Sequence, residues 1–191
     1  MMACTAFAAA TAAQTTPQAQ VEDFNRTLLY VMKNAQSLGY AGRRDALAPK
    51  LNALYHLPAM ARIAVGQHWR TLSPQQQAKL VDAFTRLTVA TYANRFNGWS
   101  GEKIEMRGTK DVRAKTILVQ TAIVRPGDED VAINYLMRQF STGWRVIDVY
   151  LKESYSEMAT KRSEYTSIIS RQGFDALIRE IEAKIVLYER A

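Results

Sequence analysis

The side chains best suited to acid–base or nucleophilic chemistry are scattered along this sequence rather than gathered into motifs. His56 and His68 have no acidic partner at a fixed spacing. Ser100 lies in Gly-Trp-Ser-Gly, but Glu102 stands where a nucleophile elbow needs its second glycine. A Ser/His/Asp triad through His68 stays open from sequence alone, although a surface or hydrogen-bonded structural histidine is the favoured interpretation. We therefore expect no catalytic residues.

Metal and cofactor motifs are also missing from the sequence. The acidic run Asp128–Asp130 follows Pro126-Gly127 in a predicted hairpin turn and lacks the regular ligand spacing of a calcium loop. Cys4 is the only cysteine, which rules out an intrachain disulfide and a multi-cysteine zinc site. The sequence contains no phosphate-binding loop, dinucleotide fingerprint or zinc-protease motif. We expect neither a metal nor a cofactor.

The charge is unevenly distributed and indicates an anionic partner. The 191 residues carry a net charge of +7, and residues 21–98 hold ten Lys/Arg against four Asp/Glu. Nucleic acid, an anionic membrane surface and an acidic protein would each complement that excess, and a merely solvated basic face would also account for it. Trp69 and Trp144 lie beside arginines, but no recognised nucleic-acid motif accompanies them, so we expect no nucleic acid.

The composition and the N-terminus predict one folded domain after a processing segment. Apolar residues make up 48% of the chain and charged residues 23%, which is ordinary for a globular protein. Residues 1–20 carry no charge, and alanine-rich small-x-small sites within them resemble the cleavage region of a secretory signal. A disordered cytosolic tail is the alternative. We expect residues 1–20 to be a signal-peptide remnant and flexible start, and residues 21–191 to form a single domain.

The first half of the chain is predicted to be helical. An apolar stripe indicates a helix over about 21–38 that Gly39 stops, and Pro49 predicts a break in the next helix. Pro58 is suited to the first turn of a short helix. Ser73-Pro74-Gln75-Gln76 predicts a capped helix that runs to about Phe96.

The second half predicts an antiparallel sheet followed by helices. Strands are expected at 103–108, 115–125, 131–140 and 144–151, joined by short turns such as Pro126-Gly127-Asp128. The two middle strands are apolar on both faces, so either another layer covers the second face or the sheet curls around a cavity. Two helices, at about 156–171 and 174–188, are expected to close the chain on either side of Gly173.

Several segments together resemble the Mla/toluene-tolerance family of periplasmic lipid-binding proteins, called MlaC-like. The segments that carry the resemblance are Pro58–Arg62, Trp69–Gln77, Phe84–Tyr92, Trp144–Val149, Arg162–Tyr165 and Gly173–Ile178. Each is weak alone, but their order and spacing across about residues 21–185 make the match specific. Tyr92–Glu102 and Ala159–Tyr165 look like the hopanoid-associated branch, HpnM. After the strand that ends at Val149, the sequence departs from the commoner phospholipid-carrier pattern.

The resemblance implies an α+β fold, in which a twisted antiparallel meander of about four strands and packed helices enclose a deep apolar pocket. It also implies a soluble periplasmic carrier, expected to be a monomer, that shuttles a phospholipid or hopanoid between membrane-bound transport complexes and meets anionic membrane surfaces transiently. The candidate lipid-binding residues are Leu80, Phe84, Leu87, Val119, Ile123, Ile133, Tyr135, Val149, Tyr165 and Ile169.

A small α+β enzyme acting on an apolar substrate is the alternative function. Such an enzyme would need a carboxylate or a tyrosine inside its pocket, and Asp148, Tyr135 and Tyr150 are the candidates on the predicted strands. A structural hydrogen-bonding role at a strand end is the favoured interpretation of Asp148.

The basic excess of residues 21–98 generates a first prediction. The protein should bind anionic vesicles weakly, and the binding should fall as salt rises, because exposed charges are screened beyond a Debye length of about 10 Å at 0.1 M salt. Co-sedimentation with anionic and neutral vesicles at low and high salt measures this. Equal binding to both vesicle types would show that the excess positive charge only forms a solvated surface and does not attract anionic membranes.

Overall fold

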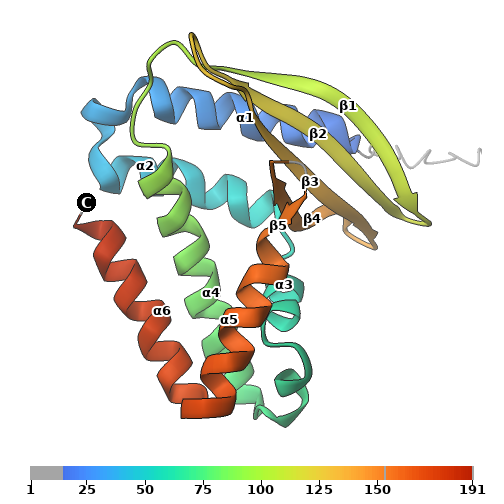
Figure 1. The fold of residues 1–191 in the computed structure, drawn as a ribbon, viewed down its shortest axis with the longest axis vertical. Coiled ribbons are helices and arrows are strands. Elements are labelled where there is room, and N and C mark those ends of the chain that lie inside the picture. Colours follow the sequence, from blue (N-terminus) through green and yellow to red (C-terminus); the bar gives the residue numbers. More distant parts are fainter. Residues whose placement is uncertain (1–14, 153, 191) are drawn as a thin grey trace, which may run out of the picture.

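Helices precede and follow one antiparallel sheet, which confirms the predicted α+β class (Figure 1). The computed structural model describes residues 15–152 and 154–190. Residues 1–14, which include most of the expected signal-peptide remnant and Cys4, lie outside the described residues. The helices are α1 (Pro17–Lys33), α2 (Ala35–Leu54), α3 (Leu57–Val65), the short 3-10 helix η1 (Gly66–Thr71), α4 (Pro74–Arg95), α5 (Glu157–Gln172) and α6 (Phe174–Glu189). The strands are β1 (Lys103–Arg113), β2 (Thr116–Val124), β3 (Val131–Phe140), β4 (Gly143–Leu151) and β5 (Tyr155–Ser156).

The sheet is an antiparallel meander in the order β1-β2-β3-β4-β5. The four predicted strands are present, but β1 extends to Arg113 rather than ending at residue 108, and β5 adds a short fifth strand. Sequence patterns missed β5 because only two of its residues pair with β4, namely Tyr155 with Leu151 and Ser156 with Tyr150. The sheet curls over α1, as Figure 1 shows.

The helices form two groups on one side of the curled sheet (Figure 1). Helix α1 lies along the inner face and packs on β1 and β2, while α2 packs on both α1 and α4. Helix α6 packs on both α4 and α5, and α5 also packs on α3 and contacts β4. Within the described ranges, none of the helices combines the length and the apolar character that crossing a bilayer requires.

The start of the domain differs from the sequence prediction. Helix α1 begins at Pro17, where Thr16 caps it by accepting a hydrogen bond from the Ala19 amide at 3.2 Å. Pro17 is buried, so residues 17–20 belong to the folded domain rather than to a flexible start. A Thr-Pro pair suits a helix start in the same way as the Ser-Pro pair at residue 73.

The first helical region has one break more than the sequence predicts, at Asn34. Helix α1 ends at Lys33 instead of Leu38, and the second helix starts at Ala35. Helical geometry does break at Gly39, as predicted, because its φ of +58° and ψ of −176° are non-helical, so α2 consists of two helical segments on either side of Gly39. Pro49 lies inside α2 without interrupting it, because burial of Leu47 and Leu51 on either side stabilises the helix despite one lost backbone hydrogen bond.

The other helix ends follow their local signals. Ser73 and Gln76 form both hydrogen bonds of a capping box at the start of α4. His56 caps α3, with its Nδ1 accepting from the Ala59 amide at 3.2 Å. Gly173 separates α5 from α6 with a positive φ of +84°, a conformation that favours glycine.

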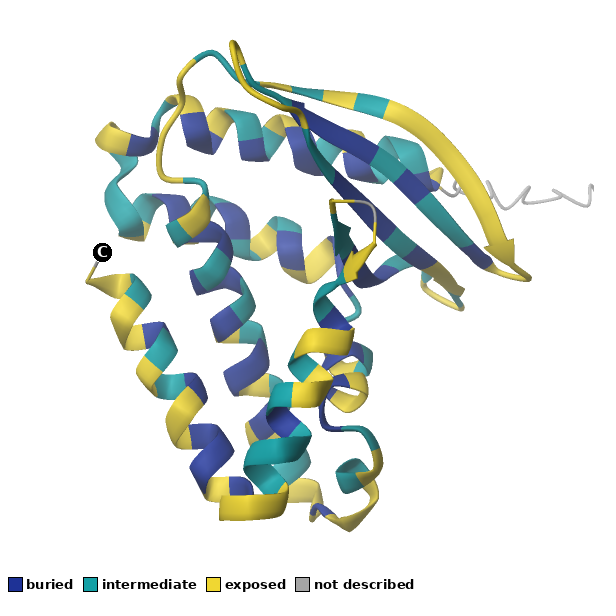
Figure 2. Cartoon of the chain, viewed as in Figure 1, coloured by how far each residue is buried: buried dark blue, intermediate teal, exposed yellow. Residues whose placement is uncertain are grey.

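The two faces of the sheet are buried to different degrees (Figure 2). On the inner face, Val119, Tyr135 and Val149 pair directly across β2, β3 and β4 and are all buried. On the outer face, Leu118 and Leu136 pair with each other and are half-buried. The inner helices therefore account for the apolar residues on the inner face of the middle strands, whereas Leu118 and Leu136 on the outer face are only partly covered.

Candidate functional site

The ten residues predicted to line a pocket form one continuous core in this structure. They are Val119, Ile123, Ile133, Tyr135 and Val149 on the sheet, Leu80, Phe84 and Leu87 on α4, and Tyr165 and Ile169 on α5. All are buried except Ile169, which is half-buried and packs against the others. Phe84 and Leu87 line hollows described below. For all ten, lining a lipid pocket stays a prediction.

An aromatic cluster connects the sheet to the helices. Phe24 on α1 meets Tyr55, Tyr92 and Tyr135 edge-on, with ring centroids 6.1, 5.6 and 6.2 Å away. The Tyr55 and Tyr92 hydroxyls share a hydrogen bond of 2.5 Å. Burial raises the pKa of all three tyrosines above the ordinary value, so the phenols stay neutral. The centre of the molecule is therefore uncharged, although it contains three hydroxyl groups.

A small inner cavity of about 30 Å³ lies beside this cluster. Its apolar wall comes from α3, α4 and the start of α5, and its polar wall comes from α4 and α5. The lining residues are Tyr55, Met60, Phe84, Thr88, Thr91, Tyr92, Arg95, Glu157, Met158 and Lys161. Phe84 is the one predicted lining residue among them.

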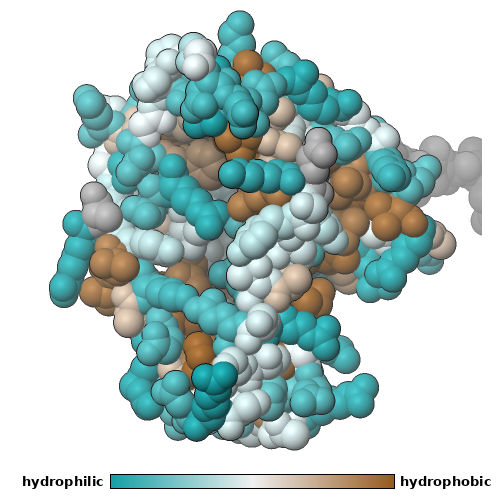
Figure 3. All heavy atoms as spheres, viewed as in Figure 1, coloured by the Kyte–Doolittle hydropathy of each residue, from teal (hydrophilic) through white to brown (hydrophobic). Residues whose placement is uncertain are grey.

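A more polar outer hollow of about 190 Å³ adjoins the inner cavity. The two share Thr91, Arg95, Glu157 and Lys161, so these four side chains form the boundary between them. The outer hollow is completed by Leu87, Tyr155, Thr160, Glu164, Lys184 and Tyr188. On the molecular face where α5 and α6 lie, Figure 3 shows hydrophilic side chains with hydrophobic atoms visible between them. The arrangement suits an amphiphile, with an apolar part inside and a polar part outside.

Charged side chains hold the boundary together. Arg95 on α4 donates to Glu157 on α5 at 2.7 Å, and Lys184 on α6 pairs with Glu164 on α5. Lys161 lies between the two pairs, with its ammonium 5.9 Å from the centroid of the Phe84 ring and 5.7 Å from that of Tyr165. Burial lowers the pKa of Lys161, and the nearby carboxylates oppose that shift.

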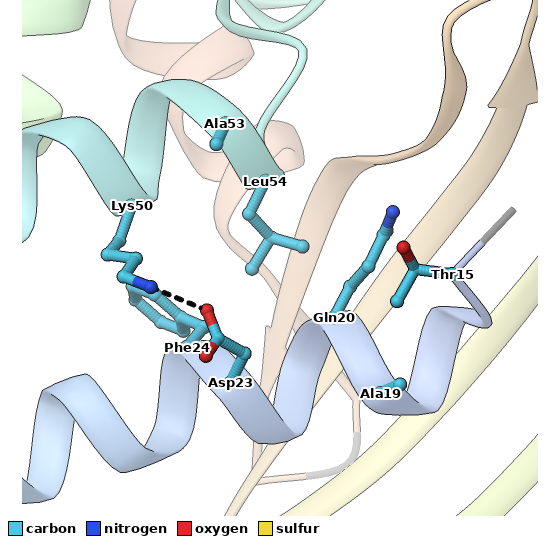
Figure 4. A pocket seen from close by; sticks show the side chains of 8 residues that line it. All are labelled: Thr15, Ala19, Gln20, Asp23, Phe24, Lys50, Ala53 and Leu54. Atoms are coloured by element: carbon cyan, nitrogen blue, oxygen red, sulfur yellow. Dashed lines mark hydrogen bonds and ion pairs between the residues drawn. The ribbon is translucent and has the colours of Figure 1, made fainter. Parts of the chain in front are cut away.

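A separate hollow, of about 230 Å³, reaches the aromatic cluster at Phe24 (Figure 4). Lys50 of α2 extends across it to Asp23 of α1, with 2.7 Å between Nζ and Oδ2. Phe24 and Leu54 form part of its apolar wall, alongside Ala19 and Ala53. Phe24 therefore lines this hollow and also contacts Tyr92, which lines the inner cavity.

Sequence reasoning missed the charged residues of the site. Arg95, Glu157 and Lys161 resemble members of solvated helix faces, and 62 residues separate Arg95 from its partner Glu157. The four-residue spacing of Glu157 and Lys161 places them on one face of a helix. Nothing in that spacing shows that the face packs against α4, so the signal was incomplete.

Asp148 has a structural role at the junction of β4 and α5. Its Oδ1 accepts from the amides of Val149 at 2.7 Å and Met158 at 3.0 Å, and Oδ2 accepts from the Ser156 hydroxyl at 2.6 Å. Burial raises the pKa of Asp148, while these hydrogen bonds oppose the rise. The carboxylate therefore anchors α5, in agreement with the structural role that the sequence analysis favoured. Asp148 is not among the residues that line the inner cavity.

The two histidines make other contacts in the structure. Besides capping α3, His56 packs its ring on Phe140 with 4.2 Å between centroids. His68 Nε2 lies 3.2 Å from the Ser170 hydroxyl at the exposed surface, and no carboxylate of the described residues hydrogen-bonds to its other nitrogen. Across residues 15–152 and 154–190, no group of three or more His, Cys, Asp or Glu side chains is placed to hold a metal ion.

The chain matches a known family and a known fold. The family model described as MlaC protein matches residues 22–183. Among solved structures, a phospholipid-binding protein from Ralstonia solanacearum, determined in complex with a phospholipid, superposes with a TM-score of 0.79. The two sequences are 20% identical, and the match covers 91% of this chain and 99% of the other. At that identity the likeness establishes the fold.

The contacts of Asp148 generate a second prediction. Asp148→Ala should lower the free energy of unfolding by about 1–3 kcal/mol, because it leaves two buried amides without their shared acceptor and frees the start of α5. Chemical denaturation measures the loss. Asp111→Ala, at an exposed position of β1, is the matched control and should change stability little. Equal effects of the two substitutions would contradict the anchoring role.

Proposed function

The chain belongs to the MlaC family, and from that premise we propose that it is a periplasmic lipid carrier that shuttles a phospholipid or a hopanoid between membrane-bound transport complexes. The observation that carries the proposal is the junction of the apolar inner cavity with the charged outer hollow across Thr91, Arg95, Glu157 and Lys161. Acyl chains would occupy the apolar side, and the head group would face the charges.

Lipid uptake would require the inner cavity to expand. About 30 Å³ is close to the volume share of a single water molecule, far less than an acyl chain needs. For the cavity to expand, α4 and α5 would have to move apart, and the Arg95–Glu157 ion pair links these two helices at the boundary with the outer hollow. Because Glu157 is only 18% exposed and Arg95 is 52% exposed, this link is partly open to water. Breaking it would cost little compared with the gain from acyl burial.

The energetics favour a carrier that docks at membranes. Burial is worth about 0.8 kcal/mol per CH₂, so two acyl chains would give on the order of 20 kcal/mol of gross transfer free energy. A bilayer offers a similar gain, so transfer is nearly balanced when the lipid passes directly between the two environments. The positive charge of residues 21–98 would help the protein meet anionic head groups or acidic partner proteins transiently.

A third prediction tests the pocket with two matched substitutions on α4. Thr91 lines both the inner cavity and the outer hollow, whereas Thr85 belongs to neither lining set. Both threonines are half-buried, and each donates to the carbonyl four residues earlier at 2.7 Å. Thr91→Trp should fill the passage and expel lipid, and Thr85→Trp should leave lipid binding unchanged.

Native mass spectrometry and lipid extraction of protein purified from its cellular compartment provide the measurement, with thermal melting as the check on folding. The wild type and Thr85→Trp should carry lipid, while Thr91→Trp should be largely lipid-free and folded. A folded Thr91→Trp protein with a full complement of lipid would contradict the position of the pocket. A wild type that carries no lipid, and takes none up from vesicles, would contradict the function itself.

A further inference from the structure

The charges that line the outer hollow do not balance. Arg95, Lys161 and Lys184 contribute three cations, and Glu157 and Glu164 contribute two carboxylates. The hollow therefore carries one positive charge in excess. Charged groups at a partly buried site are stabilised when each has a partner, so the excess charge needs identification.

Ion pairing assigns the excess to Lys161. Glu157 is engaged by Arg95 at 2.7 Å, and Glu164 is engaged by Lys184. Of the ion pairs formed by the described residues, none includes Lys161. Its ammonium instead faces the Phe84 and Tyr165 rings at 5.9 and 5.7 Å. The one cation without a carboxylate is therefore the one placed against an apolar wall.

The surroundings of Lys161 leave capacity for a polar ligand group. The Lys161 side chain is half-buried, and this burial lowers the pKa of its ammonium. One helical turn further along α5, the Tyr165 side chain is 2% exposed, and its hydroxyl has no hydrogen-bond partner among the described residues. An anion at the boundary between the inner cavity and the outer hollow would pair with the Lys161 ammonium, which has no carboxylate partner among the described residues.

We propose that Lys161 binds the anionic group, a phosphate or carboxylate, of the lipid whose chains enter the inner cavity, and that the protein thereby selects anionic lipids over uncharged ones. The inference rests on the proposed function. Lys161 is placed for this task because it lines both the inner cavity and the outer hollow. An uncharged polycyclic lipid would fill the apolar side but would leave the ammonium unpaired, so the charge favours a phospholipid as the ligand.

The test compares lipid uptake by charge variants. Delipidated wild type, Lys161→Met, Lys161→Arg and Lys79→Met are incubated with vesicles that contain equal amounts of phosphatidylglycerol and diacylglycerol, and the lipid bound to each re-isolated protein is quantified. Lys79→Met is the matched control, because Lys79 is an exposed lysine of α4 that lines neither the inner cavity nor the outer hollow. Lys161→Gln replaces Lys161→Met if the latter melts at a lower temperature.

The wild type should prefer phosphatidylglycerol by about tenfold, because a charge-assisted hydrogen bond is made only to the anionic lipid. Lys161→Met should bring the ratio close to one without lowering the total lipid bound. Lys161→Arg and Lys79→Met should keep the preference. These results together would support Lys161 as the head-group ligand.

Three outcomes would overturn the inference, and each has a different meaning. A wild type that takes up no lipid overturns the proposed function and the inference with it. Lipid uptake with the same ratio in wild type and Lys161→Met overturns the inference and leaves the function standing. Inorganic phosphate serves as a separate probe: if it binds the lipid-free protein through Lys161 while the lipid ratio is unaffected, the site serves a free anion instead.

Discussion

The fold depends on covering the apolar inner face of a strongly curled sheet. Phe24 of α1 does so at the centre, where its ring meets Tyr135 of β3 on one side and Tyr55 and Tyr92 on the helical side. Each edge-on contact adds to the burial of large aromatic surfaces, which is the dominant stabilising contribution in a core of this kind. Because one ring touches groups from the sheet and from two helical segments, the positions of α1, α4 and the sheet are mutually dependent.

That dependence determines where polar chemistry can lie. The aromatic cluster contains hydroxyls, but burial raises the pKa of its tyrosines and keeps them neutral, and the Tyr55 and Tyr92 hydroxyls hydrogen-bond to each other. Charge instead collects at the edge of the core, where α4, α5 and α6 meet and Arg95, Lys161 and Lys184 face two carboxylates. An apolar interior with a charged rim is the pattern expected of a site for an amphiphile, and the rim is built from helices rather than from the sheet.

Asp148 connects the two halves of this arrangement. It holds the first turn of α5 against β4 through Ser156 and the Met158 amide, and α5 in turn carries Glu157 and Lys161 to the rim. The carboxylate that sequence reasoning considered as a possible base therefore acts through position alone.

The sequence alone determined the features that depend on neighbours along the chain. The capping box at Ser73, the place of Pro58 in the first turn of α3, the break at Gly173 and the meander of the sheet all follow from interactions within a few residues or from strand periodicity. The family resemblance also depends only on the order and spacing of such segments. The class of fold was therefore predictable, and so was the existence of the apolar stripes on α4 and the middle strands.

Only the tertiary structure decided which of these surfaces meet and where the charges fall. Pro49 stays helical because buried leucines flank it, and Arg95 finds Glu157 across 62 residues of sequence. Hydrophobic periodicity indicates that a side chain is buried but does not show which residues it contacts. Core and pocket residues therefore look alike until the positions of the helices are known. Lys161 illustrates the reason: its solvation and its lack of a carboxylate partner depend on α4 and α6, which no spacing within α5 can reveal.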